Sequence, residues 1–371
     1  MRIRMIGQKG LPVSADSGGI ERHVDELATR LAAMGHEVTC YVRPRYADAR
    51  LTEYKGVKLQ RAPSIPTRSL DALTHSFTAT LSALVRPADV IHYHGVGPAT
   101  LAWIPRLFKP KAKVVVTFHS LDRQNAKWGF FARQYLRFGE WAATRFPHAT
   151  IAVSRSIKRY CKEKLFKDVE YVPNGATPKP HPGSDLLARW GLKPGGYILT
   201  VARLVRPKGI HHLVQAFDGF EDRVKLVIVG SGDAHSDYAE ELKALSEGNS
   251  AIVFTGFQHG KTLEQLYANA YLYAHPSEAE GLSISILEAM SAGRTVLVSD
   301  IPENMESIDH SGLTFVNADV EDLRAKLREL LNHPEIVAER GERARTWILQ
   351  EYDWDVIARK TADLYARLMR K

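Results

Sequence analysis

The residue types best suited to sugar and phosphate chemistry gather in one stretch, PSEAEGLSISILEAMSAGRTVLVS. Glu280 and Glu288 are its candidate functional acids, because carboxylates accept hydrogen bonds from hydroxyl groups. The stretch is typical of a loop, a helix that begins near Ser283 and a strand, with Gly293 fitting the position after the helix. An apolar run, 271–274, supplies a buried strand before the loop. Both acids therefore belong to one strand–loop–helix–strand unit.

The start of this helix is a candidate anion site. The first N–H groups of a helix have no partner inside it, and the helix dipole adds partial positive charge there. Gly281 lets the chain approach a ligand closely, so a phosphate or diphosphate could bind the amides of Gly281, Leu282, Ser283 and Ile284. Glu280 and Glu288 then suit sugar hydroxyls better than the phosphate itself.

Two cations occupy a similar position earlier in the chain. Arg203 and Lys208 follow a predicted strand, 197–202, and precede a helix that starts near Ile210. A guanidinium fork and an ammonium both suit the oxygens of a diphosphate. Taken alone, either residue is better explained by ordinary surface charge.

The N-terminal half adds three candidates. Gly18 and Gly19 open a helix after the first predicted strand, where a glycine pair is either a simple turn or a place for close approach of a phosphate or an acceptor. His119 follows the predicted strand 113–118, and ligands bind at such carboxyl ends of strands. His92 and His94 share one strand face, but no acid or cysteine nearby in sequence completes a metal site, so we expect no metal there.

Strands and helices alternate along the chain, which predicts an α/β protein with parallel sheets. We predict a first domain over 1–172, a hinge rich in proline and glycine over 173–196, a second domain over 197–350 and a final helix over 351–371. The helix over 127–146 carries an aromatic stripe among basic residues. That stripe fits either a membrane interface or the domain core, and we favour the core because Glu140 and three alanines dilute the membrane signal.

Several of these motifs resemble one known family. Glu280 and Glu288 form an E-x7-E pair with a proline-serine lead and LEAM-x-AG, which resembles the signature of the retaining glycosyltransferases of family 4. Leu282 and Ser283 stand where the usual pattern has phenylalanine and glycine. Members also carry a glycine pair like the one in SGGIERHVDELATRLAAMGHEV, an R-x4-KG element like that of Arg203–Gly209, and often a histidine where this chain has His119. The segments HSLDRQNAKWG and PNG resemble a bacterial subgroup associated with surface polysaccharide assembly.

The resemblance implies the GT-B fold, in which two Rossmann-like domains face each other across a cleft and the final helix crosses back onto the first. It also implies retaining transfer of a sugar from a nucleotide-diphosphate sugar to an acceptor. Arg203, Lys208 and the amides at 281–284 would stabilise the leaving diphosphate, and Gly18 and Gly19 would lie near the donor. Glu288 would hold ribose hydroxyls, Glu280 the transferred sugar, and His119 the reacting centre.

Donor and acceptor remain partly open at this point. No DxD-like acidic pair is evident, so we expect no metal and no cofactor besides the donor substrate. A lipid-linked saccharide is the favoured acceptor, and a small polar acceptor such as a cyclitol is the alternative. A nucleotide-sugar-binding protein without catalysis, a sugar epimerase and a phosphorylase are rival interpretations.

Charge is distributed unevenly. Residues 1–175 contain 28 lysines and arginines against 14 acids, a net charge of +14, whereas the remainder has 22 against 28, a net charge of −6. The basic half suits an anionic acceptor or the anionic inner face of a membrane, and no nucleic-acid motif accompanies it. With no candidate membrane span or signal segment in this sequence, we expect a cytoplasmic protein with peripheral membrane contact as an option. Cys40 and Cys161 give no redox or metal spacing.

Overall fold

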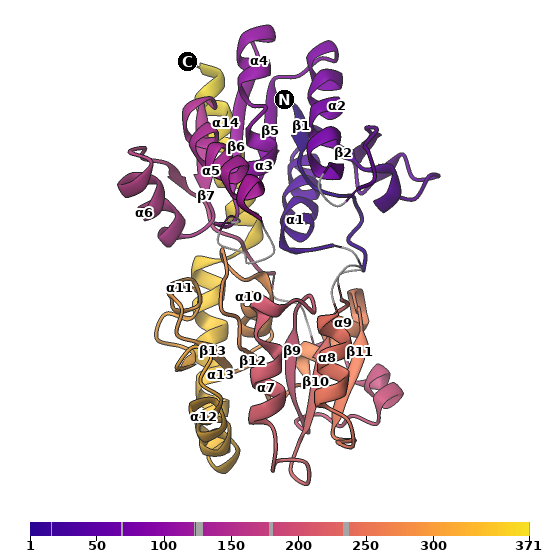
Figure 1. The fold of residues 1–371 in the computed structure, drawn as a ribbon, viewed down its shortest axis with the longest axis vertical. Coiled ribbons are helices and arrows are strands. Elements are labelled where there is room, and N and C mark those ends of the chain that lie inside the picture. Colours follow the sequence, from indigo (N-terminus) through magenta and orange to yellow (C-terminus); the bar gives the residue numbers. More distant parts are fainter. Residues whose placement is uncertain are drawn as a thin grey trace. The chain divides into compact units, whose positions relative to one another are not determined.

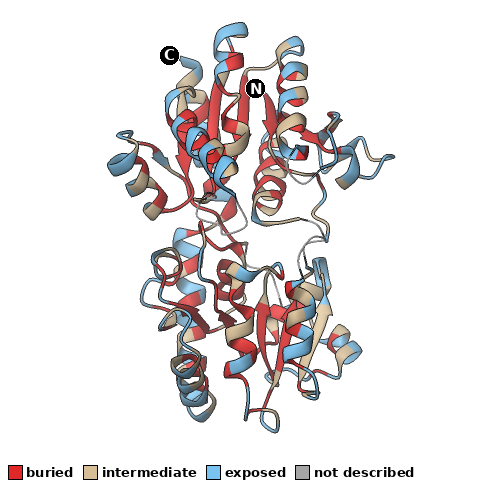
Figure 2. Ribbon diagram, in the orientation of Figure 1, coloured by how far each residue is buried: buried red, intermediate tan, exposed pale blue. Residues whose placement is uncertain are grey.

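The computed structural model describes residues 1–15, 17–67, 70–121, 123, 129–177, 181–232 and 237–370 (Figure 1). The chain forms two compact units. The first comprises Met1–Asn174 together with Trp354–Lys371, and the second comprises Gly175–Asp353. Each unit has its own buried sheet, with exposed residues concentrated on the outer helices and loops (Figure 2). Every helix in the described ranges is too short or too polar to cross a bilayer.

The first unit is built on an eight-stranded sheet with the order β3-β4-β2-β1-β5-β6-β7-β8. All neighbouring strands are parallel except β3 and β4. The strands are β1 Arg2–Ile6, β2 Glu37–Val42, β3 Glu53–Tyr54, β4 Val57–Arg61, β5 Val90–His94, β6 Lys113–Phe118, β7 Ala149–Ala152 and β8 Glu170–Tyr171. The helices are α1 Gly19–Ala33, α2 Asp71–Val85, α3 Val96–Ala99, α4 Trp103–Phe108, α5 Phe130–Arg145, α6 Arg155–Lys164 and α14 Trp354–Arg370.

The second unit has a six-stranded, fully parallel sheet with the order β11-β10-β9-β12-β13-β14. Its strands are β9 Tyr197–Val201, β10 Lys225–Val229, β11 Ile252–Gly256, β12 Leu272–His275, β13 Val296–Ser299 and β14 Leu313–Phe315. Its helices are α7 Ile210–Ala216, α8 Tyr238–Leu245, α9 Gly260–Ala268, α10 Ile284–Ser291, α11 Pro302–Ile308, α12 Val320–Asn332 and α13 Pro334–Glu351. The predicted fold class, two parallel α/β sheets, is confirmed.

The last helix returns to the first unit, as predicted. Helix α14 packs against α1, and its buried residues recur at helical spacing along one face. Arg30 on α1 pairs with Asp355 at 2.6 Å, and the Tyr365 hydroxyl lies 2.6 Å from Nδ1 of His92 on β5. The C-terminal residues are therefore part of the core of the first unit.

Both sheets reverse their strand order at a point that suits ligand binding. In the first unit β1 lies between β2 and β5, and in the second unit β9 lies between β10 and β12. Loops that leave the carboxyl ends of two such adjacent strands diverge to opposite faces and open a crevice between them. The loop after β9 contains Arg203 and Lys208, and the loop after β12 contains Glu280. The topology thus brings Arg203 and Lys208 to the same sheet edge as Glu280, which lies about 75 residues later in the sequence.

The prediction that the aromatic stripe of the helix over 127–146 faces the domain core is wrong. Phe131, Phe138 and Trp141 on α5 are exposed, with Phe131 86% exposed, whereas Tyr135 is half-buried against Thr100. Glu140 does not interrupt that exposed stripe, since it is fully buried on the other side of the helix. There it accepts hydrogen bonds from Arg123 and from the Tyr160 hydroxyl at 2.9 and 2.7 Å. Lys127 and Trp128 lie outside the described residues.

Candidate active site

Two loops of the second unit are joined by backbone contacts. The Glu278 amide and the Ser277 hydroxyl both donate to the Pro207 carbonyl, at 2.9 and 3.1 Å. Gly209 has a φ of +61°, and a Cβ at this position would lie 2.0 Å from the Pro276 carbonyl oxygen. Only glycine permits this approach, so the residue at 209 fixes the loop after β9 against the loop after β12.

A buried ion pair connects the same two loops through their side chains. Lys208 Nζ lies 2.5 Å from Glu280 Oε1, and the same oxygen lies 2.7 Å from His275 Nε2. The side chain of Glu280 is 8% exposed and that of Lys208 is 20% exposed. Sequence analysis named Lys208 and Glu280 separately and gave no hint that they are partners.

The protonation states of this group follow from its surroundings. Burial alone would raise the pKa of Glu280, but the Lys208 ammonium and the His275 hydrogen bond outweigh it, and the pKa is lowered. Burial lowers the pKa of His275 despite the neighbouring Glu280. His275 is therefore neutral near pH 7, with the proton on Nε2 facing the carboxylate. Its Nδ1 then carries a lone pair and lies 3.1 Å from the Tyr273 hydroxyl.

One oxygen of Glu280 remains available to a ligand. Oε1 accepts both Lys208 and His275, whereas Oε2 makes no hydrogen bond to the described residues. A carboxylate held rigidly by one oxygen can direct its second oxygen towards a hydroxyl group. Sequence analysis missed His275, although it immediately precedes the motif at Pro276 and ends strand β12.

Helix α10 begins beside this carboxylate. Ser283 is its N-cap and makes no side-chain capping hydrogen bond, and Ile284 is its first residue. Gly281, Leu282, Ser283 and Ile284 are all buried, so they can contribute backbone amides and not side chains to an anion site. Glu288 lies one turn further along α10 and is half-buried.

Arg203 and Arg206 differ although they are three residues apart. Arg203 is exposed, and its side chain makes no ion pair or hydrogen bond to any described residue. Arg206 pairs with Glu241 at 2.5 Å. Arg203, unlike Arg206, can thus form a new ion pair with a bound anion.

In the first unit, the glycine pair stands at the start of α1. Gly18 is the N-cap and Gly19 the first helical residue, and a Cβ at Gly19 would meet open space. Glu21 accepts hydrogen bonds from the amides of Lys9 and Gly18 at 2.9 and 2.7 Å. The buried Glu21 carboxylate therefore ties the β1–α1 loop to the helix and leaves room beside Gly19.

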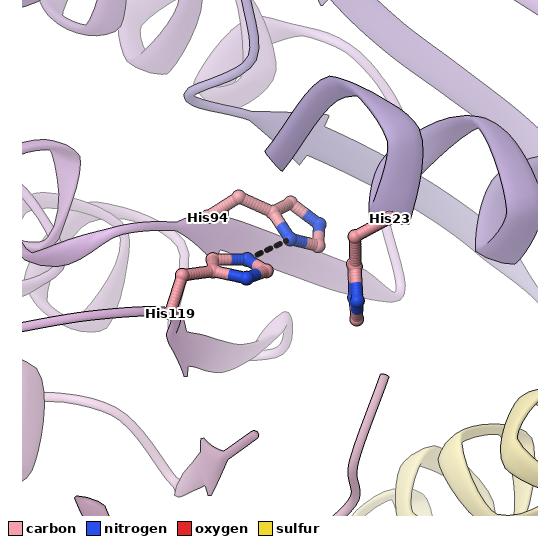
Figure 3. Close-up of side chains that lie close together, drawn as sticks. All are labelled: His23, His94 and His119. Atoms are coloured by element: carbon pink, nitrogen blue, oxygen red, sulfur yellow. Dashed lines mark hydrogen bonds between the residues drawn. The ribbon is translucent and has the colours of Figure 1, made fainter. Parts of the chain in front are cut away.

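His119 belongs to a cluster of three buried histidines (Figure 3). His94 ends β5, His119 follows β6, and His23 comes from α1. His94 Nδ1 lies 3.2 Å from His119 Nε2, and the rings of His23 and His119 meet edge to face with centroids 4.7 Å apart. Sequence analysis missed His23, because only the fold brings the first turn of α1 to the ends of β5 and β6.

His92 plays a structural role. Its Nδ1 lies 2.6 Å from the Tyr365 hydroxyl and its Nε2 lies 2.7 Å from Thr117 Oγ1, so both ring nitrogens are engaged. His92 therefore has no free ring nitrogen in this arrangement with which to bind a metal beside His94.

Burial keeps the cluster neutral. Desolvation lowers the pKa of His23 to about 4, although the bond to Asn174 raises it, and desolvation lowers the pKa of His94 and His119 well below the usual value of 6.5. Near pH 7 each ring thus has one N–H and one lone pair. Such rings can donate to or accept from a ligand, but they carry no positive charge.

Comparison with known proteins identifies the family. Residues 17–179 match the model of Glycosyltransferase Family 4, and residues 189–347 match that of Glycosyl transferases group 1. An uncharacterized glycosyltransferase of Methanocaldococcus jannaschii is 35% identical, with 94% of each chain covered. The phosphatidyl-myo-inositol mannosyltransferase of Mycobacterium leprae is 29% identical, over 98% of this chain and 96% of the relative.

Solved structures share the fold. The structure of Anabaena HepE in complex with UDP-glucose aligns with a TM-score of 0.81 at 20% identity, over 99% of this chain and all of the other. The chain belongs to glycosyltransferase family 4, a family of retaining hexosyltransferases, and has the GT-B fold. It is an enzyme that transfers a sugar from a nucleotide sugar.

The first prediction concerns the buried ion pair. Lys208→Met should lower the free energy of unfolding by about 3 kcal/mol, because it leaves the Glu280 carboxylate buried without its counterion. Adding Glu280→Gln should recover much of this loss, since no unpaired buried charge then remains. Arg206→Met is the matched control: it breaks an exposed pair on the same loop and should cost less than about 1 kcal/mol. Urea unfolding at pH 7 measures all four proteins, and equal losses for the two single variants at 206 and 208 would contradict the account.

The pH dependence of the same pair has a defined sign. The pKa of Glu280 is lowered by folding, so its contribution is fully present above the ordinary value of 4.5 and is lost as the pH falls towards the folded value. Wild-type protein should therefore lose more stability than Glu280→Gln on acidification below that pH.

Proposed function

We propose that this enzyme transfers a hexose from a nucleoside diphosphate sugar to a lipid-linked saccharide at the inner face of a cell membrane, as a step in the assembly of a bacterial surface polysaccharide. In this proposal the second unit binds the donor and the first unit binds the acceptor. The observation that carries the donor assignment is the Lys208–Glu280 pair at the β9 and β12 loops, beside the start of α10.

The donor roles follow from the chemistry of each group. Arg203 and Lys208 bind the diphosphate, together with the backbone amides of residues 281–284. Glu280 accepts a hydrogen bond from a hydroxyl group of the transferred sugar through Oε2, because Oε1 is engaged by Lys208 and His275. Glu288, one turn along α10, accepts the ribose hydroxyls.

Charge development explains why these groups accelerate transfer. The bond between the anomeric carbon and the phosphate oxygen breaks, and its electron pair moves onto the diphosphate. The two cations and the helix amides are already in place to stabilise that charge, which is the task that a metal ion performs in other transferases. Retention requires the acceptor hydroxyl to bond on the face that the phosphate leaves, so a departing phosphate oxygen is close enough to take the hydroxyl proton.

His119 contributes from the first unit. Its ring is neutral, and in our proposal it meets the transferred sugar and helps to stabilise the positively charged centre through its carbonyl or its ring. Gly18 and Gly19 leave space beside the start of α1 for the donor phosphates or the acceptor.

A rate measurement tests the donor assignment. Arg203→Ala and Lys208→Ala should each lower the turnover of donor by about 10²- to 10³-fold if the cations stabilise the leaving group. Arg206→Ala is the control on the same loop and should retain near-normal turnover, because Arg206 is already paired with Glu241. EDTA should not lower wild-type turnover. Normal turnover by both the Arg203 and Lys208 variants, or complete loss in EDTA that Mg²⁺ reverses, would refute this mechanism.

The exposed face of α5 supports a lipid-linked acceptor. At 100° per residue, Phe130, Phe131, Phe138 and Trp141 fall within about 100° of one another around the helix. Arg133 and Arg137 are exposed on the same helix. An aromatic stripe flanked by arginines is typical of helices that lie in the interface of an anionic membrane. The mycobacterial relative at 29% identity acts, by its name, on a phosphatidyl-myo-inositol, which favours a lipid acceptor here.

Vesicle binding tests this part of the proposal. Phe131→Ser combined with Trp141→Ser should weaken binding to vesicles that contain phosphatidylglycerol by about tenfold or more, because each side chain buries apolar surface in the interface. Phe166→Ser removes an aromatic side chain that is 81% exposed elsewhere in the first unit and should have no effect. Co-sedimentation of the folded proteins measures binding. Equal binding by all three, or no binding by wild type, would favour the small polar acceptor.

A further inference from the structure

We propose that His23, His94 and His119 form a binding site for a divalent transition metal ion, with zinc the best chemical match. One nitrogen from each ring lies within 4.8 Å of the other two, and all three side chains are buried (Figure 3). Of the three, only His119 has a role in the proposed transfer reaction, and the proposed donor-binding groups of the other unit include none of these histidines.

The spacing of two of the rings already suits a metal. Zinc bound by imidazole has bonds of about 2.0–2.1 Å, which places two nitrogens of a tetrahedral site about 3.3 Å apart. His94 Nδ1 and His119 Nε2 lie 3.2 Å apart and share a hydrogen bond, so a metal ion would take the place of the proton between them. A nitrogen of His23 completes a set of three, one from each ring, that lie within 4.8 Å of one another, so small rotations of the side chains bring all three to ligand distance.

The third ring is held in the tautomer that a metal needs. His23 Nδ1 lies 2.8 Å from Asn174 Oδ1, and an amide oxygen can only accept, so the proton is on Nδ1. The lone pair is then on Nε2, which is buried and has no hydrogen-bond partner among the described residues. Metal-bound histidines commonly have their second nitrogen oriented in this way by an oxygen acceptor. A buried lone pair without a donor is costly, and a metal ion would satisfy it.

The donor set selects the kind of ion. Three neutral imidazoles suit zinc and its transition-metal neighbours, whereas magnesium and calcium require oxygen ligands. Three protein ligands leave a fourth position for water or for an oxygen of another ligand. Because bound metal would occupy the ring of His119, the site also gives a means of switching that residue away from the sugar, a consequence that rests on the proposed function.

A second cluster, His211, His212 and Glu278, also has three potential ligands within reach of one another, but it differs in each of these respects. His212 and His211 are only half-buried, Glu278 is exposed, and His211 Nδ1 lies 2.7 Å from the Tyr238 hydroxyl. Among the described residues, neither histidine of this cluster has a buried ring nitrogen without a hydrogen-bond partner. The double variant His211→Ala/His212→Ala is therefore a matched control.

Metal binding can be measured directly on the untagged, full-length, chelator-treated protein. Titration with ZnCl₂ against a chromophoric chelator should give one tight site per chain. Asn174→Ala should weaken it by about 10- to 100-fold, as expected for loss of a group that orients a ligand, and His23→Ala should weaken it by more. The His211→Ala/His212→Ala variant should bind as wild type does. A circular dichroism spectrum and a melting curve establish that each variant is folded.

Cobalt gives a second readout that needs no variant. Co²⁺ added to wild-type protein should develop the intense visible absorption of a four-coordinate site, and one equivalent of Zn²⁺ should abolish it. Absence of tight zinc binding by wild type, unchanged affinity in folded Asn174→Ala and His23→Ala, or loss only in the control variant would overturn the proposal. None of these outcomes depends on transferase activity, so the metal site and the proposed function can fail independently.

Discussion

The buried contact between Lys208 and Glu280 organises the loops after β9 and β12 in the second unit. A carboxylate with so little exposure is stable only because an ammonium and an imidazole N–H both reach one of its oxygens. That arrangement fixes the position of the second oxygen and the position of the ammonium at the same time. Gly209 makes it possible, because the loop after β9 could not approach Pro276 with any larger residue. Disturbing any one of these residues therefore disturbs the positions of both the carboxylate and the ammonium.

The same topological feature positions the candidate residues of each unit. In each sheet the strand order reverses at one strand, β1 or β9. The loops that follow the neighbouring parallel strands therefore diverge at the same edge of the sheet. In the second unit this edge holds Arg203, Lys208 and Glu280. In the first it holds the glycine pair, His94 and His119, and α14 closes the core below through His92 and Tyr365. The helix at the end of the chain thus supports the strand that positions His94.

Local patterns in the sequence predicted most of the architecture. The alternation of apolar runs and amphipathic stretches located the central strands, and Gly293, with a φ of +71°, does end α10 as the sequence indicated. The strand β4 was missed, because VKLQR lies between proline-rich and polar segments and has no apolar run of its own. The boundaries of the helices shifted by one to three residues, as expected where end turns are set by tertiary contacts.

Contacts between distant residues could not be predicted in the same way. The position of His23 depends on how α1 packs over β5, and the pairing of Lys208 with Glu280 depends on the order of strands in the sheet. The aromatic stripe of α5 was assigned to the core because Glu140 and three alanines dilute the membrane signal in the sequence. In the structure Glu140 points the other way and is neutralised by Arg123, so a residue that looks polar in sequence marks the buried side of the helix. Partnership, not residue type, decides where a charged side chain lies.

The central claim is that the second unit contains a preformed, metal-independent site for a nucleoside diphosphate. The most direct test is the melting temperature of the wild-type protein with UDP, GDP, ADP or dTDP, in EDTA. A ligand present at 100 times its Kd adds about 2.7 kcal/mol to the stability of the native state, which gives a clear rise in melting temperature. The account predicts a rise with one of these nucleotides, and that nucleotide names the donor class. Unchanged melting with all four, followed by a rise only when Mg²⁺ is supplied, would contradict it.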